Sequence, residues 1–218
     1  MLHFGTLLAV IVYFRRDLWG ILRDTGSFIR GEKNGEGVKC LFWIFVASIP
    51  TAGIGFLFKE ELESLFVQPN TVGAMLLLTG SILFLTRWIK KEGRSLEQME
   101  WRDALLIGLA QGIAILPGIS RSGATIATAL FCGLNREWAG RFSFLLSIPA
   151  ILGATLFELY KVNSTTELQA VSIGTVIAFL SGLLSLAFLM KVIQKGKLFH
   201  FSYYCWAMGM LMILGLGS

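Results

Sequence analysis

Long apolar blocks alternate with short polar segments along most of this chain. Five of these blocks run for 17 to 20 residues, at 39–58, 70–88, 142–160, 171–190 and 201–217. A helix rises 1.5 Å per residue, so about 20 apolar residues cross the hydrocarbon core of a bilayer. A buried helix of a soluble enzyme could explain one such block, but five in one chain predict an all-α polytopic membrane protein. A shorter apolar stretch at 2–14 adds a further segment, and it lacks the basic n-region and cleavage site of a signal peptide.

Two half-length apolar pieces lie in the middle of the chain, at 104–116 and 124–134. Each is too short to span a bilayer alone, and the stretch 117–123 between them is polar and begins with a helix-breaking Pro-Gly pair. Non-helical backbone is tolerated at membrane depth only where protein or a water-filled cavity surrounds it. We therefore predict a re-entrant hairpin over 104–134. A single long kinked span over the same residues is the alternative, and it would reverse the side of every later loop.

Three apolar segments precede the predicted hairpin and three follow it. Pairing them in order gives opposite directions across the membrane, which is the signature of an inverted repeat. We predict a first repeat over 1–102 and a second over 103–218, each built on a re-entrant hairpin plus three spans. The first repeat lacks its hairpin within these residues, so we expect the equivalent segment upstream of Met1.

Composition and charge support the membrane assignment and give an orientation. The chain is 55% hydrophobic and 15% charged, whereas soluble domains average about 25% charged residues. If loop 15–39 is cytoplasmic and the sides alternate, the outer side receives only Lys59 and Lys161 of the 19 basic residues, and Arg121 stands alone in the hairpin. This is a strong positive-inside bias. The net charge of +5 therefore reflects orientation, and nucleic acid is excluded as a partner. The three cysteines have no C-x-x-C spacing, so they indicate neither a metal site nor a disulfide framework.

Arg121, at the tip of the predicted hairpin, is the residue that most needs an explanation. A charge at membrane depth costs about 2.5–3.5 kcal/mol on insertion scales and is functional by default. Hydroxyls and glycines surround it, and a half-helix begins beside it. Guanidinium, hydroxyls and free helix N–H groups together favour a bound phosphate. The alternative is a buried ion pair: no carboxylate occurs between Asp103 and Glu137, but a distant partner such as Glu158 is left open.

The segment around Arg121 also resembles a family signature. Residues 117–125 read Pro-Gly-Ile-Ser-Arg-Ser-Gly-Ala-Thr, which is similar to the second signature motif of the undecaprenyl-diphosphatase (bacitracin-resistance) family. Further segments that resemble the family are 2–7, 13–17, 108–112, 141–144 and 147–150. The resemblance covers essentially the whole chain and agrees with the inverted-repeat fold.

The resemblance implies hydrolysis of undecaprenyl diphosphate to the monophosphate, which recycles the lipid carrier for peptidoglycan synthesis and confers bacitracin resistance. It implies that Arg121 and Ser120 are catalytic, with Arg121 clamping the diphosphate and stabilising charge on the phosphoryl group in transfer. The residues implied to bind the diphosphate are Gly118, Ser122, Gly123 and Thr125. Attack by a serine and attack by water are both left open.

Cofactor, partners and location follow from the same resemblance. A divalent cation, Mg²⁺ or Ca²⁺, is implied, although no metal ligand is identified in these residues. The expected partners are the polyprenyl diphosphate substrate and membrane lipids, and a homo-oligomer is left open. The expected location is the bacterial inner membrane, as a multi-pass protein whose active site faces the outer, periplasmic side.

The family's first motif is missing from these residues. That motif is rich in Glu and ends in a Ser-Ser-x-Gly-His pattern, so it is expected before Met1, and the chain resembles an N-terminally truncated member. Two other functions therefore stay open. One is a carrier of polyprenyl phosphate, since inverted repeats with broken helices are typical of transporters; the other is a catalytically inactive fragment.

Overall fold

A computed structural model describes residues 2–31, 35–57, 69–89, 92–161 and 168–215, with the side chains of 2–3, 156–161 and 168–172 left out. Helices make up nearly all of these residues. The α-helices are α1 Leu2–Tyr13, α2 Arg15–Ile29, α3 Glu36–Leu57, α5 Pro69–Leu85, α6 Trp101–Ile113, α7 Arg121–Phe131, α8 Arg136–Lys161, α9 Leu168–Gln194 and α10 Phe201–Ile213. Short 3₁₀ helices are η1 Thr86–Trp88, η2 Leu96–Gln98 and η3 Leu198–His200.

Several of these helices are long and apolar enough to cross a membrane. They are Glu36–Leu57, Pro69–Trp88 and Ile173–Gln194, with shorter apolar helices at Phe4–Tyr13 and Leu198–Ile213. The predicted all-α membrane class is therefore confirmed for the described part of the chain. The last apolar block was predicted to reach 217, but its helix ends at Ile213, because the backbone turns at Leu214 and at Gly215, which has φ +71°. Residues 216–217 of the block lie outside the described residues.

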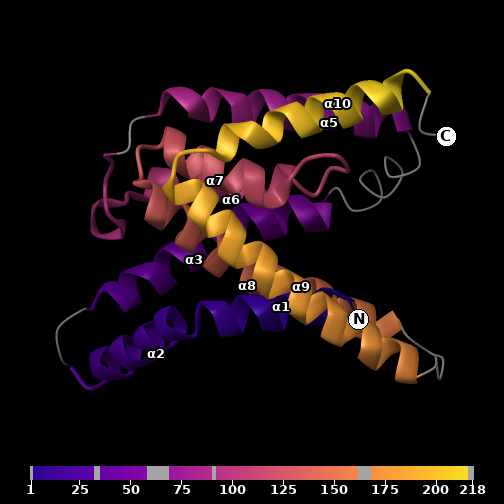
Figure 1. The fold of residues 1–218 in the computed structure, drawn as a ribbon. Helices are drawn as coiled ribbons and strands as arrows, with labels where there is room; N and C mark the ends of the chain where they lie inside the picture. The colour runs from indigo at the N-terminus through magenta and orange to yellow at the C-terminus, as the bar shows by residue number, and fades with distance from the viewer. Residues whose placement is uncertain (1, 32–34, 58–68, 90–91, 162–167, 216–218) are drawn as a thin grey trace.

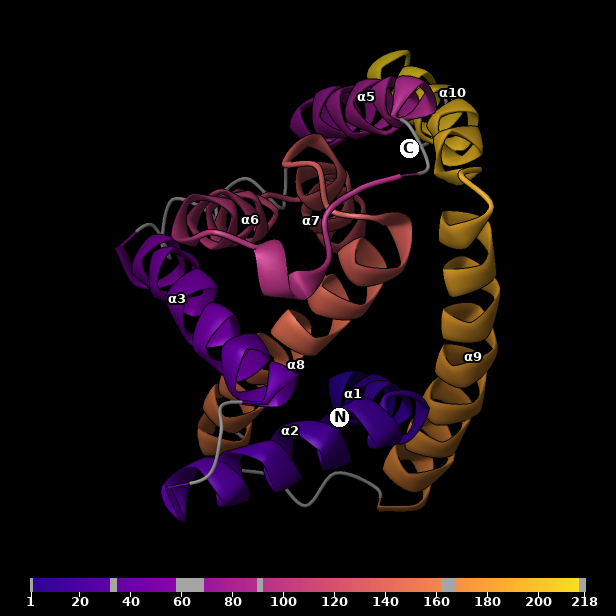
Figure 2. The same ribbon diagram turned by 90° about the vertical axis from the view of Figure 1, so that its left-hand side faces the viewer.

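The helices pack in pairs that are distant in sequence. α5 lies along α10, α1 along α9, and α3 along α6 (Figure 1). Figure 2 shows α9 running down one side of the molecule, from α10 at one end to α1 at the other. Small residues bring the α5–α10 pair together, since a Cβ on Gly73 would lie 2.9 Å from the carbonyl oxygen of Gly209. Much of the core gathers around α8, which packs against α1 and α7, and its most buried side chains include Phe14, Ile126 and Phe142.

Helix α2 lies inside the segment 15–39, which the apolar pattern predicted only as a connection between two spans. It is an amphipathic helix that buries Ile21 and packs on α3. Two polar contacts hold it: the Gly37 N–H donates to Asp24 Oδ2 at 2.9 Å, and Asp17 pairs with Arg141 of α8 at 3.4 Å. A search by mean hydropathy misses such a helix, because the polar residues of its charged face offset the hydropathy of its apolar face.

The two half-length pieces of 104–134 form α6 and α7, which pack side by side and are tied together at their outer ends. Arg94 makes this connection. Its guanidinium pairs with Asp103 near the start of α6 at 2.9 Å and donates to the Cys132 carbonyl just after α7. Its backbone exchanges hydrogen bonds with Gly133 and Asn135 at 2.8 and 2.9 Å. Both ends of this segment therefore meet. Its re-entrant placement in a membrane, and the division into repeats at 1–102 and 103–218, stay predictions.

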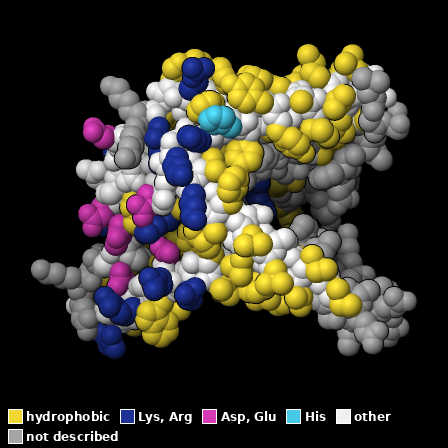
Figure 3. Space-filling view, in the orientation of Figure 1, with side chains coloured by type: hydrophobic (Ala, Val, Ile, Leu, Met, Phe, Trp, Pro, Cys, Tyr) yellow, Lys and Arg dark blue, Asp and Glu magenta, His cyan; other side chains and the backbone are white. Residues whose placement is uncertain are grey.

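Charged and apolar side chains occupy different parts of the surface. Figure 3 shows Lys, Arg, Asp and Glu gathered toward one end of the molecule, whereas hydrophobic side chains cover much of the rest of this face. Among the apolar side chains, Phe45, Phe56, Leu184 and Phe188 are each more than 60% exposed. Exposed apolar area on this scale is typical of a surface that contacts lipid.

Candidate active site

The turn between α6 and α7 holds the sequence motif in a defined shape. Gly118 has φ +92°, a left-handed conformation that glycine adopts without a steric penalty. Ser120 is the N-cap of α7: its hydroxyl accepts a hydrogen bond from the Gly123 N–H at 3.2 Å, and its carbonyl accepts one from Ala124 at 2.8 Å. Because serine is a preferred N-cap residue, the sequence itself starts the helix at Arg121.

Helix α5 supports this turn from outside the motif. The Thr79 hydroxyl, which is 2% exposed, donates to the Gly118 carbonyl at 3.0 Å and accepts from the Ser120 N–H at 3.3 Å. A Cβ on Gly118 would overlap the Val72 carbonyl oxygen, so glycine is also required for this close approach. Thr79 therefore fixes the position of the turn that presents Arg121.

Replacing Thr79 by valine is expected to lower kcat about tenfold for the diphosphate hydrolysis that the sequence resemblance implies, because the similar shape keeps the packing while both hydrogen bonds to the turn are lost. KM should change less, since both of these hydrogen bonds go to the backbone of the turn. The measurement is steady-state phosphate release by the purified variants. Thr79→Ser keeps the hydroxyl and should restore kcat. Equal losses in the valine and serine variants would contradict a positioning role for the hydroxyl.

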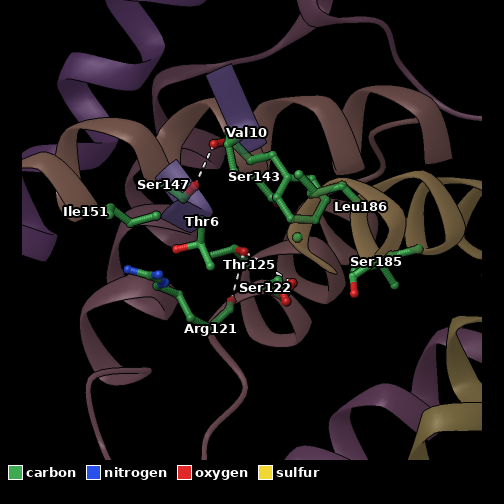
Figure 4. Close-up of a pocket in the computed structure, with 13 residues that line it drawn as sticks. Thr6, Val10, Arg121, Ser122, Thr125, Ser143, Ser147, Ile151, Ser185 and Leu186 are labelled. Carbon is green, nitrogen blue, oxygen red and sulfur yellow. Dashed lines mark hydrogen bonds between the residues drawn. The ribbon is translucent and has the colours of Figure 1, made fainter. Parts of the chain in front are cut away.

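Arg121 borders a cavity of about 360 Å³ that lies between α1, α7, α8 and α9. Its polar lining consists of the guanidinium and several hydroxyls, from Thr6, Arg121, Ser122, Thr125, Ser143, Ser147 and Ser185. In Figure 4 the Arg121 side chain extends along the cavity toward Thr6 and Ile151. α7 begins at this residue, so the positive end of the helix dipole adds to the guanidinium charge. The arrangement suits an anion with several oxygen atoms.

None of the ion pairs among the described side chains involves Arg121. The described residues that line the cavity include no Asp or Glu. Glu158, the distant partner considered from the sequence, has a side chain outside the described set. Within the described part of the chain, the cavity therefore places a cation among hydroxyls without a neutralising carboxylate.

A second cavity, of about 530 Å³, adjoins the first. The two share Ser122, Ser185 and Leu189. The lining of the second cavity is mostly apolar and comes from α5, the motif turn, α7, α9, η3 and α10. A polar chamber that continues into an apolar one matches the outline of a lipid with a charged head group.

The sequence-predicted site residues divide between the two cavities. Arg121, Ser122 and Thr125 line the first, whereas Gly118, Ser120, Ser122 and Gly123 line the second. Two of these groups already have partners within the motif: the Thr125 hydroxyl donates to the Arg121 carbonyl at 2.9 Å, and the Gly123 N–H donates to the Ser120 hydroxyl at 3.2 Å.

Sequence reasoning did not select the hydroxyls that α1, α8 and α9 contribute. Ser143 and Ser147 are four residues apart, so they share one face of α8. That spacing was a usable signal for a polar face on an otherwise apolar helix. Thr6 and Ser185 carry no comparable signal, because only the packing of α1 on α9 brings them to the cavity.

Comparison with known proteins gives the family. The bacitracin resistance protein BacA family matches residues 1–211. This chain belongs to that family. Among the relatives of the BacA family, a protein of Halothermothrix orenii is 42% identical over 99% of this chain and 82% of its own length. A protein of Alkaliphilus metalliredigens is 40% identical over 98% of this chain and 82% of its own length. A protein of Methanobrevibacter smithii is 39% identical over 98% of this chain and 82% of its own length. All three are named undecaprenyl-diphosphatase, so the family predicted from residues 117–125 is confirmed.

The first cavity lacks the usual ligands of a divalent cation among its described residues. Mg²⁺ and Ca²⁺ prefer carboxylate and carbonyl oxygens arranged around the ion. The described residues of the chain form no cluster of three or more His, Cys, Asp or Glu side chains. The first cavity offers a guanidinium and hydroxyls instead. These side chains do not fit a divalent-cation site by themselves.

Proposed function

We propose that this chain hydrolyses undecaprenyl diphosphate to undecaprenyl phosphate, recycles the lipid carrier for peptidoglycan synthesis and thereby confers bacitracin resistance. The observation that carries the proposal is the placement of Arg121 at the start of α7, beside hydroxyls and without a described acidic partner. Membership of the BacA family supports the reaction, because the relatives are named for it.

Arg121 has the central role in this proposal. Its guanidinium binds the diphosphate through paired N–H donors and stabilises the charge that develops on the transferred phosphoryl oxygens. Ser120 contacts the same phosphate from the second cavity, and Ser122 faces both cavities. Gly118 and Gly123 keep the turn free of bulk.

Thr125 contributes to this head-group site when its hydroxyl proton turns from the Arg121 carbonyl to a phosphate oxygen. The apolar second cavity receives the first part of the polyprenyl chain. Head group and tail thus bind on either side of Ser122.

Location and cofactor belong to the proposal as well. The protein is placed in the bacterial inner membrane, in the orientation that the asymmetry of Lys and Arg along the chain supports. On family grounds, its active site is placed toward the periplasmic side. A divalent cation, Mg²⁺ or Ca²⁺, is proposed on family grounds, with ligands other than the described cavity residues. Chelation with EDTA followed by readdition of Mg²⁺ or Ca²⁺ tests this point through the rate of phosphate release.

Phosphate release from undecaprenyl diphosphate tests the function. Purified protein in proteoliposomes is given the lipid, and inorganic phosphate is followed together with the distribution of lipid between leaflets. Release of one phosphate per lipid supports the diphosphatase. Redistribution of lipid without phosphate release would favour the carrier instead. The absence of both signals would favour a catalytically inactive chain.

A further inference from the structure

Ser143 of α8 has an unusual environment for a serine in a helix. Its side chain is 3% exposed, and its Oγ has no hydrogen-bond partner among the described atoms. Other helix serines here bind the carbonyl one turn earlier: Ser48 donates to Ile44 at 2.7 Å, and Ser147 donates to Phe144 at 2.7 Å. Leaving a buried hydroxyl without a partner is unfavourable, so the position of Ser143 needs an explanation.

The Ser143 side chain belongs to the wall of the Arg121 cavity. Figure 4 shows α8, which carries Ser143 and Ser147, on one side of this cavity and the start of α7, which carries Arg121, on another. The cavity is about 360 Å³, which leaves room for a phosphate group between them. The Ser143 Oγ itself is covered in this structure, so a side-chain rotation toward the cavity would bring its hydroxyl to a ligand oxygen there. That oxygen is an acceptor that the described part of the protein does not provide.

We propose that Ser143 is a further diphosphate-binding residue, which donates its hydroxyl hydrogen bond to a phosphate oxygen held across the cavity by Arg121. The proposal rests on the proposed function, since it takes the ligand to be a polyprenyl diphosphate. It adds a residue of α8 to a site otherwise built from the motif at 117–125. Residues of α7 and α8 then bind the same head group.

The experiment measures ligand binding, because the Kd reports on the Ser143 contact whether or not the protein hydrolyses the ligand. The probe is farnesyl diphosphate, a soluble short polyprenyl diphosphate, titrated onto the purified protein in detergent by calorimetry. Ser143→Ala is expected to raise Kd about tenfold or more, the loss of one hydrogen bond to a charged group. The melting temperature of the free Ser143→Ala protein should equal or exceed that of wild type, because the variant removes a buried hydroxyl without a partner.

Thr155 provides the matched control. It lies three turns further along α8, is 6% exposed, and its Oγ1 also lacks a partner among the described atoms, but it is not part of either cavity wall. Thr155→Ala should leave Kd for farnesyl diphosphate unchanged. Ser147→Ala should raise Kd less than Ser143→Ala, since its hydroxyl is already bonded to the backbone.

A Ser143→Ala protein that binds farnesyl diphosphate within twofold of wild type would overturn the proposal. So would a lower melting temperature combined with unchanged binding, which would make Ser143 a packing residue. If wild type itself binds no farnesyl diphosphate but releases phosphate from the full-length lipid, the Ser143 proposal fails while the proposed function stands. If it does neither, both fail.

Discussion

Replacing Arg121 by alanine is expected to lower the rate of phosphate release about a hundred- to a thousandfold. Among the described residues that line the first cavity, Arg121 is the only cation and none is acidic. Removing a preorganised group that stabilises transition-state charge typically costs this much. The measurement is phosphate release from undecaprenyl diphosphate by wild type and variant, with helical content checked by circular dichroism.

Two further variants separate charge from geometry at this position. Arg121→Lys keeps the charge but loses the planar pair of donors, so it should recover only part of the rate. Arg102→Ala removes an exposed guanidinium that lies over the Trp101 ring of α6, away from the cavity, and should retain wild-type turnover. Full activity of Arg121→Ala would contradict the phosphate-binding role of this residue.

Replacing Gly118 by alanine is expected to abolish most activity and to lower the free energy of unfolding by about 2 kcal/mol or more. An L-residue with φ +92° is strained by about 1–2 kcal/mol, and the added Cβ would also overlap the Val72 carbonyl of α5. The turn must then move away from α5, which breaks its hydrogen bond to Thr79 and displaces Arg121.

A second glycine, Gly31, allows backbone strain to be separated from the overlap with α5. It has φ +82°, and a Cβ there would meet nothing within 4 Å, so Gly31→Ala measures the backbone strain alone. We expect a loss of about 1–2 kcal/mol without a change in turnover. Thermal unfolding in detergent and phosphate release give both quantities. Gly118→Ala and Gly31→Ala variants with equal stability losses and unchanged turnover would contradict the claim that the turn requires glycine at 118 to approach α5.

The sequence predicted the parts of this fold that depend on local pattern. Apolar blocks such as the described part of 39–58, which lies on α3 Glu36–Leu57, form helices because length and hydropathy decide that outcome along the chain. The polar stretch 117–123 interrupts a helix because Pro and Gly disfavour its continuation, and Ser120 then caps the next one. Helix α2 was missed, although its 3.6-residue periodicity was present in the sequence.

The site was predicted less completely, since most of its wall depends on tertiary packing. Residues 117–125 stood out because a charge and hydroxyls occur together in an apolar segment. Thr79 is one hydroxyl within an apolar span, and nothing in its neighbourhood indicates that it faces the turn. For Ser143, the spacing to Ser147 indicates a polar face of α8, but only the packing of α8 beside α7 shows that this face lines the Arg121 cavity. The roles of Arg121, Ser120 and the other predicted site residues stay predictions until the variants are measured.

A structure of the protein with a polyprenyl methylenediphosphonate, which cannot be hydrolysed between its phosphorus atoms, tests the central claim most directly. The account predicts the diphosphonate in the 360 Å³ cavity, with oxygens about 3 Å from the Arg121 guanidinium and the polyprenyl chain entering the adjoining apolar cavity. A head group bound elsewhere on the protein, with Arg121 making no contact to it, would contradict the account.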